Sequence, residues 1–178
     1  MGSGGVGKSA LTVRFINGSY LEWYDPTNRK QLTVDALPCL LEILDTAGID
    51  QYLTLNDLFI RESDGFVLCF SLAQRDTLEE IIRLRETIYR IKMPPGDHNV
   101  PMVLVGNKAD LVDDRQVSAE ECHDLAIAWG CRYYETSARR SLGVHAVFEE
   151  IVRRMREATW GKVRRDGRER KGRKCVIL

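Results

Sequence analysis

The sequence predicts an α/β domain in which helices flank a mostly parallel central sheet. Gly65 to Leu72 and Pro101 to Gly106 are continuous apolar runs of strand length, as expected of parallel strands buried on both faces. Between them, Asp76 to Lys92 carries apolar residues at helical spacing, with Glu and Arg in the intervening positions. Strands that alternate with helices in a chain of 178 residues are typical of one α/β domain.

The first part of the chain predicts a helix followed by a β-hairpin. Lys8 to Asn17 is the expected first helix, and Gly18 is its expected end. Lys30 to Asp35 and Cys39 to Asp45 are two expected strands, joined by a turn around residues 36–38.

The second half of the chain predicts two helices around a short strand. Ser118-Ala119-Glu120-Glu121 is a capping box, so we expect a helix that begins there and ends at Gly130. Arg132 to Thr136 is the expected last strand. A final helix is expected from apolar residues at helical spacing, namely Val144, Val147, Phe148, Ile151, Val152 and Met155. This periodicity stops after Trp160, which predicts that the rest of the chain is disordered.

Composition and charge exclude several classes of function. No apolar run reaches the roughly 18 residues that a membrane span needs, and no signal peptide is recognisable, so synthesis in the cytosol is expected. The five cysteines form no C-x-x-C pair and the three histidines lie far apart, so no zinc or redox site is expected. Net charge is zero, but residues 161–174 contain eight basic and two acidic residues. We expect a separate basic arm and no nucleic-acid partner.

The chain opens M-G-S-G-G-V-G-K-S and so contains a complete phosphate-binding loop, G-x-x-x-x-G-K-S. Its glycines let backbone N–H groups point at phosphate oxygens, and the helix that follows adds the partial positive charge of its N-terminus. Lys8 supplies a charge near the β- and γ-phosphates, and Ser9 offers a hydroxyl to Mg²⁺. The loop predicts a P-loop NTPase fold. Only Met1 precedes the loop, so we expect the N-terminal central strand to be missing and its neighbours' backbone groups to be unpaired.

Three tetrapeptides follow expected strands, at the end where parallel sheets bind ligands. Asp45-Thr46-Ala47-Gly48 offers a carboxylate to the magnesium shell and the Gly48 N–H to a γ-phosphate. Asn107-Lys108-Ala109-Asp110 offers the Asp110 carboxylate to the N1–H and exocyclic amine of guanine, a donor pair that adenine lacks. Glu135-Thr136-Ser137-Ala138 offers a backbone N–H to guanine O6. Together they predict a guanine-nucleotide site.

The ordered set G-x-x-x-x-G-K-S, Y-D-P-T, D-T-A-G, N-K-A-D and E-T-S-A resembles that of the Ras-type small GTPases, from Gly2 to the C-terminus. The resemblance implies a switch between GDP and GTP forms with Mg²⁺ as cofactor. It implies that Ser9 and Thr27 bind Mg²⁺ and that Asp45 acts on the metal through water. It also implies nucleotide binding by Gly2, Gly4, Gly5, Val6, Gly7, Lys8, Ser9, Ala10, Tyr20, Asn107, Lys108, Asp110, Ser137 and Ala138.

Ile49 departs from the Ras pattern, which places a glutamine directly after D-T-A-G to orient the attacking water. Isoleucine has no hydrogen-bonding group. The Rap branch also lacks that glutamine and relies on an asparagine of its activating protein, and Gln51 matches a glutamine also present in Rap proteins. The resemblance therefore implies a Rap-like enzyme with very slow intrinsic hydrolysis. Its expected catalytic residues are Thr27, Gly48 and Gln51.

The segment that contacts effectors in this family is four residues shorter here. Tyr24-Asp25-Pro26-Thr27 is followed by Asn28-Arg29-Lys30-Gln31, where the family has Y-D-P-T-I-E-D-S-Y-R-K-Q. Four residues correspond to about 13 Å of extended chain. We expect that the strand edge to which effectors add their own strand is largely lost, and that Thr27 is drawn away from the metal.

The C-terminus predicts a lipid anchor. Cys175-Val176-Ile177-Leu178 is a C-a-a-X box whose final Leu favours a geranylgeranyl chain on Cys175. One lipid gives marginal membrane residence, and the basic residues before it supply a second signal at an anionic leaflet. We expect a GTPase domain over residues 1–160 and a disordered basic tail with a prenylation box over residues 161–178. The expected location is the cytoplasmic face of the plasma membrane or of another endomembrane.

Two other hypotheses remain open. The shortened segment and the missing strand favour a prenylated, non-switching pseudo-GTPase that serves as a binding module. A kinase or ATPase would use the same loop for ATP, which Asp110 disfavours. The leading hypothesis implies an exchange factor, a GTPase-activating protein and effectors as partners. Gly4 and Gly5 carry no side chain that would block an arginine from the activating protein.

Overall fold

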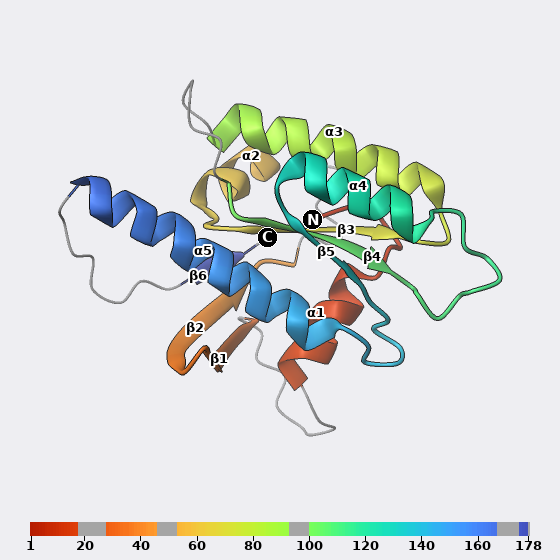
Figure 1. Ribbon diagram of the computed structural model, residues 1–178, viewed down its shortest axis with the longest axis horizontal. Coiled ribbons are helices and arrows are strands. Elements are labelled where there is room, and N and C mark those ends of the chain that lie inside the picture. Colours follow the sequence, from red (N-terminus) through yellow and green to blue (C-terminus); the bar gives the residue numbers. More distant parts are fainter. Residues whose placement is uncertain (18–27, 46–52, 93–99, 167–174, 178) are drawn as a thin grey trace.

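Two three-stranded sheets lie edge to edge at the centre of the molecule (Figure 1). The computed structural model describes residues 1–17, 28–45, 53–92, 100–166 and 175–177. The first sheet has the order β1-β2-β6, with β1 (Arg29–Val34) antiparallel and β6 (Cys175–Ile177) parallel to β2 (Leu37–Ile43). The second has the order β3-β4-β5 and is wholly parallel, and consists of β3 (Phe66–Ser71), β4 (Met102–Asn107) and β5 (Arg132–Glu135). The predicted mostly parallel sheet is confirmed.

Helices cover both faces of these strands (Figure 1). On one face lie α2 (Leu53–Glu62), α3 (Arg75–Lys92) and α4 (Ala119–Trp129), and on the other lie α1 (Lys8–Asn17) and α5 (Val144–Asp166). Side chains of β3 alternate between two cores, because Phe66, Leu68 and Phe70 pack toward α3 while Val67 and Cys69 pack toward α1 and α5. Burial on both faces explains the continuous apolar runs and confirms the α/β prediction.

The caps of α4 lie where the capping box predicts them. The Ser118 hydroxyl accepts a hydrogen bond from the Glu121 amide at 3.1 Å, which satisfies one of the unpaired donors of the first turn. At the other end Gly130 has φ 64°, and its N–H donates to the carbonyl oxygens of Ala126 and Ile127. This left-handed residue stops the helix, as glycine commonly does after the last turn.

The β1–β2 hairpin turns earlier than the sequence predicts. Asp35 and Ala36 are its two loop residues, with φ of 51° and 62°, and Val34 pairs with Leu37. Positive φ at both positions is what a type I′ turn needs, so residues 37 and 38 belong to β2 instead of the turn. β1 has six residues at the outer edge of its sheet, as many as the expected strand Lys30 to Asp35 and shifted by one position.

The C-terminal part also differs from the prediction. α5 continues to Asp166, beyond the end expected near Trp160, because Lys and Arg are good helix formers even without an apolar stripe. Cys175–Ile177 forms β6 where a disordered terminus was expected, because an open strand edge is available beside β2. Residues 167–174 lie outside the described residues. None of the helices described is both long and apolar enough to cross a membrane.

Within the described residues no strand precedes α1, and Met1 lies beside β3. Its amino group donates to the Val67 carbonyl oxygen at 2.6 Å, and its own carbonyl oxygen accepts from the Cys69 amide at 2.8 Å. Met1 and β6 therefore share the position expected for the missing central strand. The prediction that the neighbouring strands keep their backbone groups unpaired is wrong at these places.

Candidate functional site

The loop of residues 2–7 lies beside the carboxyl ends of the parallel strands. Asn107 ends β4 and Glu135 ends β5, and α1 begins directly after the loop. Parallel strands end at the same edge of a sheet, which is where α/β proteins bind ligands. The segments that the sequence predicts to bind a nucleotide are thus gathered at one edge.

The loop needs glycine where it approaches the strands. Gly2 has φ 141°, and a Cβ atom there would lie 2.0 Å from a carbonyl oxygen of β3. Gly7 has φ 98°, and its Cβ would lie 2.4 Å from Nδ2 of Asn107. Around Gly4 and Gly5 there is open space. The loop is therefore packed on one side and open on the other, where a phosphate group could approach its backbone.

Lys8 reaches back over the loop that precedes it. Its Nζ donates to the carbonyl oxygen of Ser3 at 2.7 Å and also to that of Gly2. The Ser3 hydroxyl donates in turn to the carboxylate of Glu80 on α3. The ammonium group is held at the loop, and phosphate oxygens would be stronger acceptors for it than these neutral carbonyl groups.

Asn107 joins three segments of the site. Its side chain is 2% exposed, and its Nδ2 donates to the Val6 carbonyl oxygen at 2.8 Å. Its Oδ1 accepts from the Thr136 hydroxyl at 3.1 Å and from the Ala138 amide at 3.4 Å. These contacts tie the loop, the end of β4 and the residues after β5 together. The sequence predicts that Asn107 binds the base, and the contacts described here are with the protein.

Asp110 is held by a hydrogen bond from the opposite segment. The hydroxyl of Ser137, which is buried, donates to Oδ1 of Asp110 at 2.6 Å and accepts from the Arg140 amide at 3.0 Å. The Ser137 bond lowers the pKa of Asp110 below its ordinary value. Lys108, two residues before, has φ 64°, so the chain turns sharply between Asn107 and Asp110. An ionised carboxylate is thereby presented beside Ser137 and Ala138.

An ion pair supports the residues that follow β5. The Arg115 guanidinium contacts the Glu135 carboxylate through both of its terminal nitrogens, one of them at 3.1 Å. This contact lowers the pKa of Glu135, and the Tyr133 hydroxyl donates to the same carboxylate at 3.0 Å. Gly143 packs so closely that a Cβ there would lie 2.6 Å from the Glu135 carbonyl oxygen. Glu135, at the end of β5 and the start of this segment, is therefore held by contacts with Arg115, Tyr133 and Gly143.

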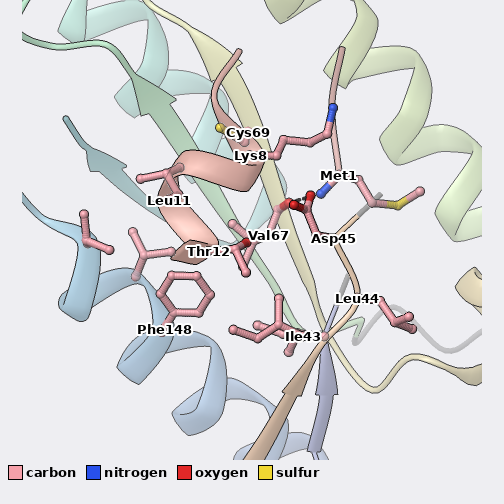
Figure 2. A pocket seen from close by; sticks show the side chains of 13 residues that line it. Met1, Lys8, Leu11, Thr12, Ile43, Leu44, Asp45, Val67, Cys69 and Phe148 are labelled. Carbon is pink, nitrogen blue, oxygen red and sulfur yellow. Dashed lines mark hydrogen bonds between the residues drawn. The ribbon is translucent and has the colours of Figure 1, made fainter. Parts of the chain in front are cut away.

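A pocket of about 30 Å³ lies behind the loop, between α1, α5 and the two sheets (Figure 2). Lys8 and Asp45 line its polar part, and Figure 2 shows Leu11, Thr12 and Phe148 on its apolar part. Asp45 lies two residues after the end of β2, and Ser9 lies in the first turn of α1. Hydroxyl and carboxylate oxygens are ligands that Mg²⁺ prefers, so these two residue types fit the predicted metal shell.

Four predicted site residues lie outside the described residues, namely Tyr20, Thr27, Gly48 and Gln51. Ile49 lies outside them as well. Their roles remain predictions from the sequence. The loop residues, Lys8, Asn107, Asp110, Ser137 and Ala138 are those that the structure brings together.

Some residues of the site were not singled out from the sequence. Thr136 stands inside the E-T-S-A tetrapeptide, and its buried hydroxyl bonds to Asn107. Arg115 and Glu80 belong to no recognisable motif. Their contacts join segments that are distant in the sequence, so the sequence alone does not reveal them. The contact of Arg115 with Glu135 is seen only in the folded structure.

A comparison with protein families adds an independent finding. The family model described as the Ras family matches residues 1–157. The match includes the loop, α1 and the ends of β4 and β5, where the geometry described above is concentrated.

Proposed function

The chain belongs to the Ras family, whose members are small GTPases, and from this premise we propose that it is a Rap-like GDP/GTP switch anchored to a membrane. We propose further that it hydrolyses GTP slowly and depends on an activating protein. Its proposed location is the cytoplasmic face of the plasma membrane or of another endomembrane.

The proposed choice of guanine rests on the 2.6 Å hydrogen bond from Ser137 to Asp110. The bond leaves the second carboxylate oxygen and the remaining lone pairs of the first to accept the N1–H and exocyclic amine of guanine. A purine without this donor pair would leave a polar carboxylate unsatisfied, which weakens binding. Asn107 serves as a positioning residue, because its contacts hold the base side against the phosphate side.

The phosphates are proposed to lie over the open side of the loop. Lys8 would exchange the carbonyl oxygens of Gly2 and Ser3 for phosphate oxygens, a change that favours the charged ligand. Ser9 and Asp45, with Thr27, would hold Mg²⁺, which neutralises charge on the phosphates when it is bound. These residues would bind and orient the phosphates and the metal ion. Their contribution to the reaction would be mostly stabilisation of charge.

Slow hydrolysis is proposed because Ile49 stands where Ras proteins have the glutamine that orients water. Gln51 and the Gly48 amide remain as the candidate groups near a γ-phosphate. The open space around Gly4 and Gly5 leaves room for a group supplied by an activating protein. The six residues of β1 at the sheet edge are the candidate surface for effectors.

Membrane anchoring is proposed from the C-a-a-X box at Cys175 and from the basic residues before it. A geranylgeranyl chain together with positive charge gives the two signals that stable anchoring needs. An exchange factor is the further partner that the resemblance to the family implies for the switch.

Titration of fluorescent GDP with Mg²⁺, competed by GTP and then by ATP, tests the nucleotide part of the proposal. We expect micromolar or tighter binding that GTP reverses and ATP does not. Asp110→Asn should shift the preference from guanine toward xanthine nucleotides, because the amide donates where the carboxylate accepts. Asp113→Asn, an exposed aspartate on the same loop, is the matched control and should leave the preference unchanged.

The rival hypotheses give different results in this experiment. A pseudo-GTPase that serves as a binding module would bind neither nucleotide. A kinase or ATPase would release the fluorescent ligand to ATP. Unchanged base preference in Asp110→Asn would contradict the role given to this carboxylate.

A further inference from the structure

Two different parts of the fold hold the phosphate loop in place. The side chain of Asn107 donates to the backbone of its second half at 2.8 Å. In its first half, the Ser3 hydroxyl donates to the carboxylate of Glu80, which lies on α3, 77 positions further along the sequence. Gly4 and Gly5 stand between these two contacts, with open space around both. The open part of the loop is therefore framed by one attachment to β4 and one to α3.

The first half of the loop rests on the turn of α3 that carries Glu80. A Cβ atom at Gly2 would lie 3.4 Å from Cδ1 of Ile81, the residue that follows Glu80. Ile81 is fully buried and belongs to the core between α3 and the sheet. Ser3 is half-buried and Glu80 is exposed. The hydrogen bond between them therefore closes over a packed contact, at the border between the loop and solvent.

The beginning of α3 is a rigid support for this bond. The Thr77 hydroxyl accepts from the Ser71 amide at 3.0 Å, which ties the first turn of the helix to the end of β3. The Arg75 guanidinium contacts the Glu121 carboxylate on α4 through two nitrogens, at 2.6 and 3.1 Å. Glu80 lies in the next turn of α3, so its side chain starts from a backbone position that two neighbouring elements hold.

Ser3 also carries a contact of Lys8. The carbonyl oxygen of Ser3 accepts from Nζ of Lys8 at 2.7 Å, while the hydroxyl of Ser3 donates to Glu80. One residue thus joins a carboxylate of α3 to the ammonium group that is proposed to bind phosphates. When this ammonium group moves to phosphate oxygens, Ser3 loses its contact with Lys8 and keeps the one with Glu80. Glu80 is then the group that holds this half of the loop.

The chemistry of the pair suits this role. A hydroxyl that donates to a carboxylate makes a charge-assisted hydrogen bond, which is stronger than a bond between neutral groups. Backbone N–H groups bind phosphate only while they keep their inward direction, and glycine by itself imposes no direction on the chain. An attachment at Ser3 therefore restricts the loop directly before Gly4 and Gly5, where side chains give no restriction.

We propose that Glu80 is a positioning residue of the phosphate site, which acts through Ser3 to hold the loop in the shape that binds phosphate groups. The effect on the loop follows from the contacts, and the effect on a nucleotide rests on the proposed function. A loop that is held open to phosphates and closed to other shapes releases its ligand slowly. The main effect is therefore expected on the rate at which GDP leaves.

The dissociation rate of fluorescent GDP in the presence of Mg²⁺ tests the proposal. Ser3→Ala removes the donor and Glu80→Ala removes the acceptor, and each should speed release about threefold to tenfold. Both substitutions in one chain should speed release no more than either alone, because they remove the same bond. Glu79→Ala removes an exposed carboxylate one position earlier on α3 and should leave the rate unchanged. Additive effects of the first two substitutions, or an equal effect of Glu79→Ala, would overturn the proposal.

Glu80→Gln separates the hydrogen bond from the charge. The side-chain carbonyl oxygen of glutamine still accepts from the Ser3 hydroxyl, while the negative charge is gone. We expect release within about twofold of the wild-type rate. An equal change in Glu80→Gln and Glu80→Ala, in either direction, would show that the charge and not the hydrogen bond matters. That result would refute the positioning role.

Two further measurements need no nucleotide. The bond between Ser3 and Glu80 lies at the surface, so the midpoint of urea unfolding should be the same for wild type, Ser3→Ala and Glu80→Ala. NMR relaxation of the chain without nucleotide should give lower backbone order parameters at Gly4 and Gly5 in both variants than in wild type or Glu79→Ala. Unchanged order parameters would overturn the proposal. A lowered urea midpoint would make the pair a general stabiliser and would contradict the positioning role.

The proposed function and the role of Glu80 fail in different ways. A wild-type chain that binds no GDP contradicts the proposed function, and the order parameters of Gly4 and Gly5 still decide whether Glu80 holds the loop. A chain that binds GDP and releases it equally fast in all variants keeps the proposed function and refutes the role of Glu80.

Discussion

The side-chain amide of Asn107 donates a hydrogen bond to the carbonyl oxygen of Val6 at 2.8 Å, across 101 positions of the sequence. This bond joins the phosphate loop to the end of β4. The same side chain accepts from Thr136 and Ala138, so one buried residue sets the spacing between the phosphate side and the base side of the site.

Asn107→Ala should therefore weaken both stability and nucleotide binding. The Val6 carbonyl group and the Thr136 hydroxyl would lose their partner in a buried place, which costs about 1–3 kcal/mol of the free energy of unfolding. Urea denaturation gives this quantity, and the dissociation rate of fluorescent GDP should rise. Asn17→Ala, at the exposed end of α1, is the control and should change stability by no more than about 0.5 kcal/mol. Equal stability of the two variants would contradict the role of Asn107.

Gly7→Ala should be far more harmful than Gly4→Ala. The new Cβ at position 7 would lie 2.4 Å from Nδ2 of Asn107 at a residue with φ 98°, so both packing and backbone conformation oppose it. Position 4 has open space and no positive φ. Thermal unfolding of the two variants checks this difference. We expect Gly7→Ala to lose about 1–3 kcal/mol of the free energy of unfolding, and its Tm should fall by several degrees. Gly4→Ala should keep a Tm close to that of the wild type.

Ser137→Ala should make guanine binding more sensitive to acid. The Ser137 hydroxyl is the main cause of the lowered pKa of Asp110. A lowered pKa keeps the Asp110 carboxylate ionised as the pH falls. The contribution of this carboxylate to guanine binding is therefore lost only when the pH passes through the lowered pKa. Without the hydroxyl the pKa of Asp110 rises, so affinity for GDP should begin to fall at a higher pH. Titrations of GDP from neutral pH down to about pH 4 would reveal the shift, and coincident pH profiles would speak against it.

Ile49→Gln should accelerate intrinsic GTP hydrolysis. Glutamine supplies the hydrogen bond to the attacking water that isoleucine lacks, and one such bond of about 1.4 kcal/mol corresponds to roughly tenfold in rate. Single-turnover hydrolysis without an activating protein measures it. Ile49→Leu, which adds no polar group, should retain the slow rate. A wild-type rate as fast as that of the glutamine variant would remove the basis for the Rap-like assignment.

The parts of the fold predicted correctly are those with a strong local signal. β3 and β4 are buried on both faces, so nearly every residue in them is apolar and the run is recognisable without its partners. Ser118 and Gly130 carry the chemistry that starts and stops α4. The phosphate loop and the N-K-A-D and E-T-S-A segments follow strands, so their convergence could be predicted from the direction of parallel strands.

The parts that were not predicted depend on contacts between distant segments. β6 is three residues long and has no periodicity, and it forms because β2 and β3 leave an edge open. The two-residue turn places Ala36 at φ 62°, a conformation that alanine rarely adopts and that no sequence rule assigns to it. The role of Asn107 as a connection between segments follows only from the positions of Val6 and Thr136.

Met1 and Ile177 both lie within the sheet layer, and Figure 1 marks the two chain ends near the middle of the molecule. A bulky group attached at Met1 or at Ile177 would displace the hydrogen bonds of Met1 with β3 or the pairing of β6 with β2. Val112, which is 70% exposed on the loop before α4, is a position where a short epitope or a fluorophore would leave these contacts undisturbed. For cell imaging and pull-down work, the label on this protein therefore belongs in the middle of the chain.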